Sequence, residues 1–279
     1  MNRRQLAADL SRPLAVVLAL ALGPALPAQT GNNTANRAAP AINRMNNPDL
    51  EPVALNALRA MSTRLRTATS FSFDAHIMRE EPGTNGQMLD FFKDIRVQVE
   101  RPDRIRMDVS SDTSDMRLWC DGKNVTLMPA SAKIYTTLPA SPTLDATLAM
   151  LKSKVQAHTP LIPFLSSDPY AIFSDGLASA NEVGIDNEGN DQFLHLAFTE
   201  PDADWQLWLS GPNEILPRRM AIVYKTIEGQ PRVTIEFSHW NLNAEIPRDA
   251  FVFAKPEGAL AVGWNALQQR TFPQGGKAQ

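Results

Sequence analysis

Apolar and polar residues alternate with a period of two along most of this chain, in two series separated by one helical segment. In the first series the alternation is clearest over 70–78, 95–100 and 104–109. Such alternation predicts strands with one buried and one solvent-facing side. Turn signals at 101–103 and 121–122 predict short connections, and short connections join antiparallel neighbours.

The second series of strands is expected after residue 176. It covers 177–186, 191–199, 204–210, 216–226 and 231–240, and a short strand at 251–253 completes it. With about five or six strands before residue 140, the chain is expected to form one sheet of about eleven strands. A sheet of this size has an apolar face that must be covered.

Two helical segments are available to cover that face. The first is expected over 49–66, with Pro52 in its first turn. The second covers about 142–174, where Leu144, Leu148, Leu151 and Val155 form one helix stripe. In this insert, Thr159 and Asp168 are N-cap candidates because each precedes a proline that can take the first helical position. The expected fold class is therefore α+β, with helices on one face of a large antiparallel sheet.

The N-terminus predicts export. An apolar run at 14–22 follows Arg3, Arg4 and Arg12, and residues 1–28 are interpreted as a signal peptide cleaved after Ala28 or, alternatively, Ala25. The run is too short to span a bilayer, which needs roughly 20 apolar residues. The arginine pair leaves both the general secretory and the twin-arginine routes open. Residues 29–47 are expected to be a disordered leader, 48–262 the folded domain and 263–279 a flexible tail.

Charge and cysteine content exclude several classes of function. Loss of three arginines and one aspartate with residues 1–28 takes the formal net charge from −3 to −5, which does not favour nucleic acid as a partner. The only cysteine, Cys120, lies far from the cleavage point. The mature chain therefore has no internal disulfide and no lipid anchor on an N-terminal cysteine.

No motif predicts a catalytic centre, a metal or another cofactor. There is no Gly-x-Ser-x-Gly sequence, and Cys120 is interpreted as a small residue beside a turn. The four histidines, which are His76, His158, His195 and His239, lack metal-ligand spacing. Acidic residues around Gly189 depart from the calcium-loop pattern and are interpreted as a hairpin turn.

Several motifs resemble one family. They are DWQLWL at 204–209, LPRRM at 216–220, PRVTIEF at 231–237, IPRDAFVFAKPEG at 246–258, FSF at 71–73, RPDRIRM at 101–107 and WCDGK at 119–123. Over about 50–260 the chain is similar to the DUF2092 family of predicted periplasmic proteins, whose architecture resembles the LolA/LolB and LppX-like lipoprotein carriers. The resemblance implies a periplasmic protein with a strongly curved sheet, an incomplete barrel whose hollow side is closed by helices and receives acyl chains.

The insert carries the candidate ligand-binding residues. They are more apolar than short surface helices require: Leu148, Met150, Leu151, Leu161, Ile162, Phe164, Leu165 and Phe173. These side chains are interpreted either as a movable lid over an apolar cavity or as a permanently packed core. The resemblance favours the lid.

The function expected is a non-enzymatic periplasmic carrier or sensor of a lipid, a lipoprotein acyl chain or another hydrophobic molecule. The alternative is an envelope regulatory or assembly module that binds a partner protein at a sheet edge. An enzyme is the third hypothesis. We expect a monomer without a cofactor or a membrane anchor.

Overall fold

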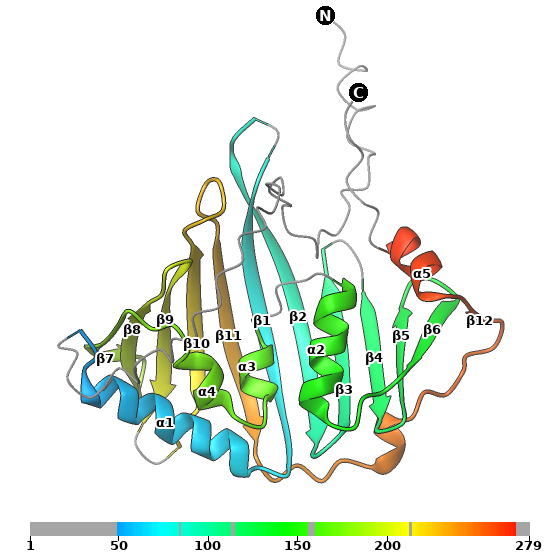
Figure 1. Cartoon of the computed structure of the whole chain (residues 1–279), viewed down its shortest axis with the longest axis horizontal. Helices are drawn as coiled ribbons and strands as arrows, with labels where there is room; N and C mark the ends of the chain where they lie inside the picture. The colour runs from blue at the N-terminus through cyan, green and yellow to red at the C-terminus, as the bar shows by residue number, and fades with distance from the viewer. Residues whose placement is uncertain (1–48, 84, 113–114, 156–159, 212–213, 272–279) are drawn as a thin grey trace, which may run out of the picture.

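The computed structural model describes residues 49–83, 85–112, 115–155, 160–211 and 214–271. The predicted signal peptide (1–28) and leader (29–47) lie outside these residues. Within them the chain forms one curved sheet of 12 strands with helices on one face (Figure 1). The predicted fold class, α+β with a large, open, curved sheet, is confirmed.

Two meanders make up the sheet. Its strands are β1 (Ser70–Pro82), β2 (Met88–Glu100), β3 (Arg104–Ser111), β4 (Met116–Asp121), β5 (Asn124–Pro129), β6 (Ile134–Pro139), β7 (Ser179–Glu188), β8 (Asp191–Thr199), β9 (Ala203–Ser210), β10 (Pro217–Tyr224), β11 (Arg232–Asn241) and β12 (Leu260–Ala261). Consecutive strands pair antiparallel within β1–β6 and within β7–β11, as the turn signals predict. The meanders join where β1 pairs antiparallel with β11, with Ile77 opposite Ile235.

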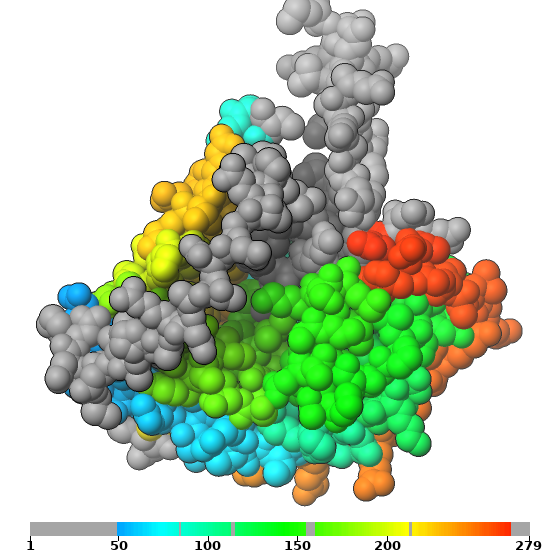
Figure 2. All heavy atoms as spheres, in the orientation of Figure 1, coloured from blue at the N-terminus to red at the C-terminus, as the bar shows by residue number. Residues whose placement is uncertain are grey.

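The main helices lie on the concave face. They are α1 (Pro52–Thr67), α2 (Leu144–Val155), α3 (Ile162–Leu165) and α4 (Pro169–Phe173). In Figure 1, α1 crosses in front of the β7–β11 half, α3 and α4 lie above it, and α2 lies in front of β2 and β3. Figure 2 shows α1, α4 and α2 as one continuous surface over this part of the sheet.

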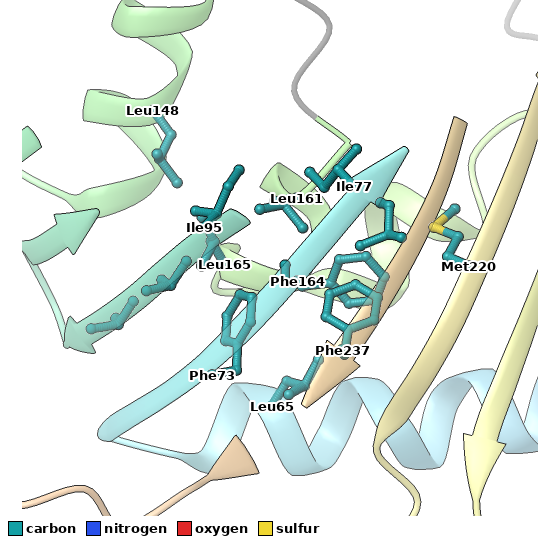
Figure 3. Packing of buried hydrophobic residues seen from close by; sticks show 14 of the residues in the cluster. Leu65, Phe73, Ile77, Ile95, Leu148, Leu161, Phe164, Leu165, Met220 and Phe237 are labelled. Atoms are coloured by element: carbon teal, nitrogen blue, oxygen red, sulfur yellow. The ribbon is translucent and has the colours of Figure 1, made fainter. Parts of the chain in front are cut away.

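A single apolar cluster fills the space between these helices and the sheet. Leu58, Met61 and Leu65 of α1 are fully buried, as are Phe71 and Ile235 on the concave side of the sheet. Figure 3 shows Leu65, Phe73, Phe164 and Phe237 pointing into this cluster from α1, β1, α3 and β11. The predicted helix over 49–66 is confirmed, and Val53, which is 52% exposed, lies on the solvent side of its first turn.

The convex face is polar. Arg96 lies beside Asp74, with 3.4 Å between Nε and Oδ1, and Arg219 lies 3.0 Å from Glu236. The guanidinium of Arg106 stacks on the Trp119 ring at 3.8 Å from its centroid. Such half-exposed pairs add little to stability, so the free energy of folding comes mainly from the concave side.

Two predictions near the C-terminus are wrong. Residues 251–253 do not form a strand. Phe251 ends a 3-10 helix (Arg248–Phe251), and Phe253 packs against Trp119 and Tyr135 on the convex face. Instead, β12 pairs with β6, and it is the only named strand in the described part of the chain to pair parallel. The expected flexible tail from 263 contains helix α5 (Trp264–Thr271), whose Leu267 is fully buried.

Helix caps in the insert agree in part with expectation. Asp168 accepts a hydrogen bond from the Ala171 N–H at 3.1 Å, so its predicted role as N-cap of α4 is confirmed. Thr159 lies outside the described residues, and α3 begins at Ile162 after Leu161 rather than at Pro160. The proline in its first turn is Pro163.

Replacing Phe73 by alanine is expected to destabilise the protein strongly. The ring is 1% exposed and contacts Trp240 at 4.3 Å and Phe237 at 5.8 Å between centroids. We expect Phe73→Ala to lower the free energy of unfolding by about 3–5 kcal/mol in urea denaturation. The matched control, Phe92→Ala, removes a ring that is 41% exposed on the opposite face and should cost less than about 1 kcal/mol. Equal losses for both variants would contradict this assignment of faces.

Candidate functional site

The structure brings the predicted site residues of the insert onto the concave face of the sheet. Six of them are buried: Leu148, Leu151, Leu161, Phe164, Leu165 and Phe173. The remaining two, Met150 and Ile162, are partly buried. The insert is therefore seated on the sheet in this structure.

Aromatic rings connect α3 and α4 to the β9–β11 region. Phe164 lies edge-on to Phe237 of β11 at 4.7 Å between centroids and to Phe173 of α4 at 5.0 Å. Phe173 in turn lies 5.4 Å from Trp205 of β9. Because α3 and α4 have only four and five residues, these contacts rather than helix propensity hold them in place.

Arg101 ties the insert to the rest of the molecule. Its Nη2 donates to the carbonyl of Ser166, between α3 and α4, at 2.8 Å, and its Nε donates to the carbonyl of Ala68 at 3.2 Å. Its guanidinium lies 5.3 Å from the centre of the Phe71 ring. Burial lowers the pKa of Arg101, and nearby Asp145 opposes that effect. One side chain thus links the insert, the end of α1 and the sheet.

Two further polar contacts hold the same segment. Asp145 of α2 accepts from the Ser167 N–H at 3.0 Å. Arg59 of α1 donates to the Tyr170 hydroxyl at 3.0 Å and stacks over that ring at 4.4 Å. Sequence reasoning missed both contacts and Arg101, because an arginine before a turn or on a helix face is typical of a solvated residue.

Two cavities bordered by described residues lie away from the insert. One, of about 570 Å³, is lined by outward-facing side chains of β1–β4, including Asp74, Asp94 and Arg117. The other, of about 1000 Å³, lies at the turns that end β7 and β9 and is lined by Asn190, Arg218 and other residues. Neither is lined by a residue of 142–174. Where the insert covers the concave face, its own buried side chains occupy the space against the sheet.

Histidine and carboxylate side chains form separate pairs. His76 lies 2.7 Å from Asp94, and His239 lies 3.0 Å from Asp74. Among the described residues, no group of three His, Cys, Asp or Glu side chains is placed to hold a metal ion. His158 lies outside the described residues. These pairs fit the cross-strand pairing of a polar sheet face.

Cys120 is buried at the end of β4, as its interpretation as a structural residue requires. Its thiol donates to the Asp103 carbonyl at 3.2 Å. Burial raises the pKa of Cys120, which disfavours the reactive thiolate.

The acidic segment around Gly189 is a hairpin turn. Glu188 pairs with Asp191 across β7 and β8, and Gly189 takes a positive φ of 64°. This conformation favours glycine. The predicted turn is confirmed.

A family model described as "Predicted periplasmic protein (DUF2092)" matches residues 54–264. The chain belongs to the DUF2092 family. This confirms the family expected from the sequence motifs, and the family description agrees with the predicted periplasmic location. No curated protein sequence matches the chain significantly. In the part of this DUF2092 protein that the structure describes, no helix has the length and apolar character needed to cross a membrane.

Solved structures similar to this DUF2092 protein include several bacterial proteins. For the Mycobacterium tuberculosis lipoprotein LppX, identity is 12%, 71% of this chain and 100% of that chain are covered, and the TM-score is 0.42. LprF from Mycobacterium bovis is 13% identical, with 71% of this chain and 98% of that chain covered and a TM-score of 0.42. A LolA superfamily protein from Nitrosomonas europaea is 10% identical, with 70% of this chain and 97% of that chain covered and a TM-score of 0.35. At these identities the likeness concerns the fold alone.

Removing the Arg101 side chain from the DUF2092 protein is expected to loosen the insert selectively. Arg101→Met loses charge-assisted hydrogen bonds to Ser166 and Ala68, each of which contributes about 1–3 kcal/mol. Hydrogen exchange should show faster exchange of the amides of Phe164, Leu165 and Ser166 than in the wild type, while amides of β1 and β2 keep their protection. Arg64→Met, which removes an exposed arginine of α1, is the control. It should leave the exchange rates of the insert amides and of the β1 and β2 amides unchanged. Equal loss of protection in insert and sheet would contradict a local role.

Proposed function

We propose that this protein is a periplasmic carrier or sensor of a hydrophobic molecule. The molecule binds against the concave face beneath α3 and α4, the C-terminal part of the insert. The molecule is a lipid, the acyl chain of a lipoprotein or another apolar ligand. The observation that carries the proposal is how short the helices α3 and α4 are compared with the apolar surface beneath them. Two helices of four and five residues, held by three polar contacts, close a large apolar face.

Displacement of the insert would exchange one apolar contact for another. Leu161, Phe164 and Leu165 are each fully buried, so lifting α3 uncovers apolar surface on the helix and on the sheet. An acyl chain placed there restores burial worth about 25 cal/mol per Å² of apolar surface. The free energy of ligand binding is then the difference between two apolar interfaces, which allows both loading and release.

Backbone geometry supports a movement that includes α4. Gly176 follows this helix with a φ of 73°, and no atom lies within 4 Å of the position that a Cβ would take there. Such a residue can absorb a change of backbone direction without a steric penalty. α1 stays in place in this proposal because Leu58, Met61 and Leu65 anchor it.

A reversible tether between α2 and the segment between α3 and α4 tests whether α3 and α4 must move away from α2. Asp145 and Ser167 are neighbours, because the Asp145 carboxylate accepts from the Ser167 N–H at 3.0 Å, and this pair is chosen for an engineered disulfide. In a Cys120→Ala background, the variant Asp145→Cys/Ser167→Cys would be oxidised and titrated with the neutral apolar probe N-phenyl-1-naphthylamine. We expect oxidation to weaken probe binding at least about tenfold and reduction to restore it, since about 1.4 kcal/mol corresponds to tenfold.

The reduced form of the same variant controls for effects on folding. Cys120→Ala alone should bind the probe like the wild type in both redox states. Unchanged affinity in fully oxidised protein would contradict the lid, and failure of the wild type to bind the probe would overturn the carrier proposal.

A second candidate function is recognition of an envelope protein at the sheet edge formed by β7. Val183 and Ile185 of this strand are 56% and 53% exposed, which favours an apolar contact with a partner. A photo-crosslinking residue at position 183, expressed in the periplasm, should then give one discrete protein adduct. The same residue at exposed position 117 on β4 serves as control, and adducts identical at both sites would argue against edge recognition.

A further inference from the structure

Beyond the packed core, the concave side of β1 and β2 changes from apolar to charged. Ile77 is opposite Lys93, Arg79 is opposite Phe91, and Glu81 is opposite Leu89. Since Ile77 and Ile95 are buried on the concave side, the alternation of side chains places Arg79 and Lys93 on that side as well. Figure 3 shows that Ile77 lies further along β1 than Phe73. The two basic side chains therefore begin where the apolar cluster ends.

Neighbouring strands continue the apolar wall next to them. Arg79 pairs with Val233 of β11, and Val233 pairs with Ile222 of β10. Val233 is 4% exposed and Ile222 is 7% exposed. Tyr224 lies two residues beyond Ile222 on the same strand and interacts electrostatically with Arg79. A basic pair and a phenol thus border an apolar surface.

The charges at this position do not cancel. Arg79 forms an ion pair with Glu81, and their side chains are 29% and 24% exposed. Lys93 is half-buried, and no residue in the described part of the chain forms a hydrogen bond or an ion pair with it. Among the described residues, Lys93 therefore has no acidic partner in this partly desolvated site, where an unpaired charge is costly.

The acid–base behaviour of Lys93 reflects this environment. Burial, together with the positive charge of Arg79, lowers the pKa of Lys93 to about 8. An anion placed between the two side chains would relieve the repulsion and restore the protonated form.

We propose that Lys93, assisted by Arg79, binds the anionic headgroup of an amphiphilic ligand whose alkyl chain lies on the apolar concave face. The headgroup is a carboxylate or a phosphate, both of which accept hydrogen bonds from ammonium and guanidinium groups. This inference rests on the proposed function, because it assumes that the alkyl chain occupies the space under the insert. It adds that an anionic amphiphile binds more tightly than a neutral one of equal length.

Lysine side chains also cover apolar surface with their methylene groups and extend the ammonium into water. In that arrangement the charge of Lys93 would not affect ligand choice. Substitutions that keep the length of the side chain but change its charge separate the two roles.

The experiment compares an anionic and a neutral probe on the full mature chain. The anionic probe is 11-(dansylamino)undecanoic acid, and the neutral one is N-phenyl-1-naphthylamine. We expect Lys93→Met to weaken binding of the carboxylate probe about tenfold, with neutral-probe binding unchanged, and Lys93→Arg to retain most of the affinity. Lys123→Met, which removes an exposed lysine in the turn after β4, is the control for net charge. Competition with dodecanoate and with dodecyl phosphate then distinguishes a carboxylate from a phosphate ligand.

A pH titration gives an independent readout. Of the residues that the structure describes, the charged or titratable groups that share this part of the concave face with Lys93 are Arg79, Glu81 and Tyr224. Burial raises the pKa of Tyr224, so the phenol stays neutral near pH 8, and arginine keeps its charge there. Affinity of the wild type for the carboxylate probe should therefore fall as the pH rises through about 8, while Lys93→Met should show no such step.

The outcomes separate this inference from the proposed function. Neutral-probe binding together with equal carboxylate affinity in wild type and Lys93→Met would overturn the headgroup site and leave the carrier proposal standing. Absence of binding of both probes to the wild type would overturn both. Thermal unfolding of Lys93→Met should occur at or above the wild-type temperature, because the substitution removes a partly buried charge.

Discussion

Burial of the concave face is the interaction on which the rest of this structure depends. A curved sheet of 12 strands presents one apolar side, and the chain has no disulfide with which to stabilise it otherwise. α1 covers part of this side with a regular amphipathic stripe. α3 and α4 cover another part with side chains that are almost all apolar. The second cover consists of two very short helices held by tertiary contacts, and this difference between the covers is the physical basis of the proposed ligand site.

Periodicity in the sequence was sufficient to predict most of the fold. The strands of both meanders follow directly from residues such as Phe71 and Phe73, or Val233 and Ile235, because a half-buried strand requires alternation. The same rule failed at 251–253, where Phe251 and Phe253 also alternate. There Phe251 is buried and Phe253 packs against Trp119, so both rings are covered without the backbone hydrogen bonds of a strand. A short polar helix such as α5 has too weak a pattern to be recognised, although Leu267 anchors it.

The candidate site was predictable only in part. A leucine and phenylalanine stripe in the insert identified residues that contact the sheet, but it has the same composition in a lid and in a core. Arg101 was visible only as part of a turn, since its contacts with Ala68 and Ser166 join segments distant in the sequence. Lys93 was missed because the predicted strand began at Ile95. Only the observed pairing of Ile77 with Lys93 shows that this lysine shares the apolar side.

The pairing of β1 with β11 also bears on how an exported chain reaches this structure. Ser72 pairs with Asn241, so the strand near the start of the domain finds one of its two neighbours close to the domain's end. Until the later segment has paired with it, one edge of the first meander stays open, with unpaired backbone groups and an incompletely covered apolar side. Pairings between residues so distant in sequence form slowly. Completion of the sheet is thus a late event in folding, and the half-built sheet, with one edge unpaired, is the form most exposed to wrong association.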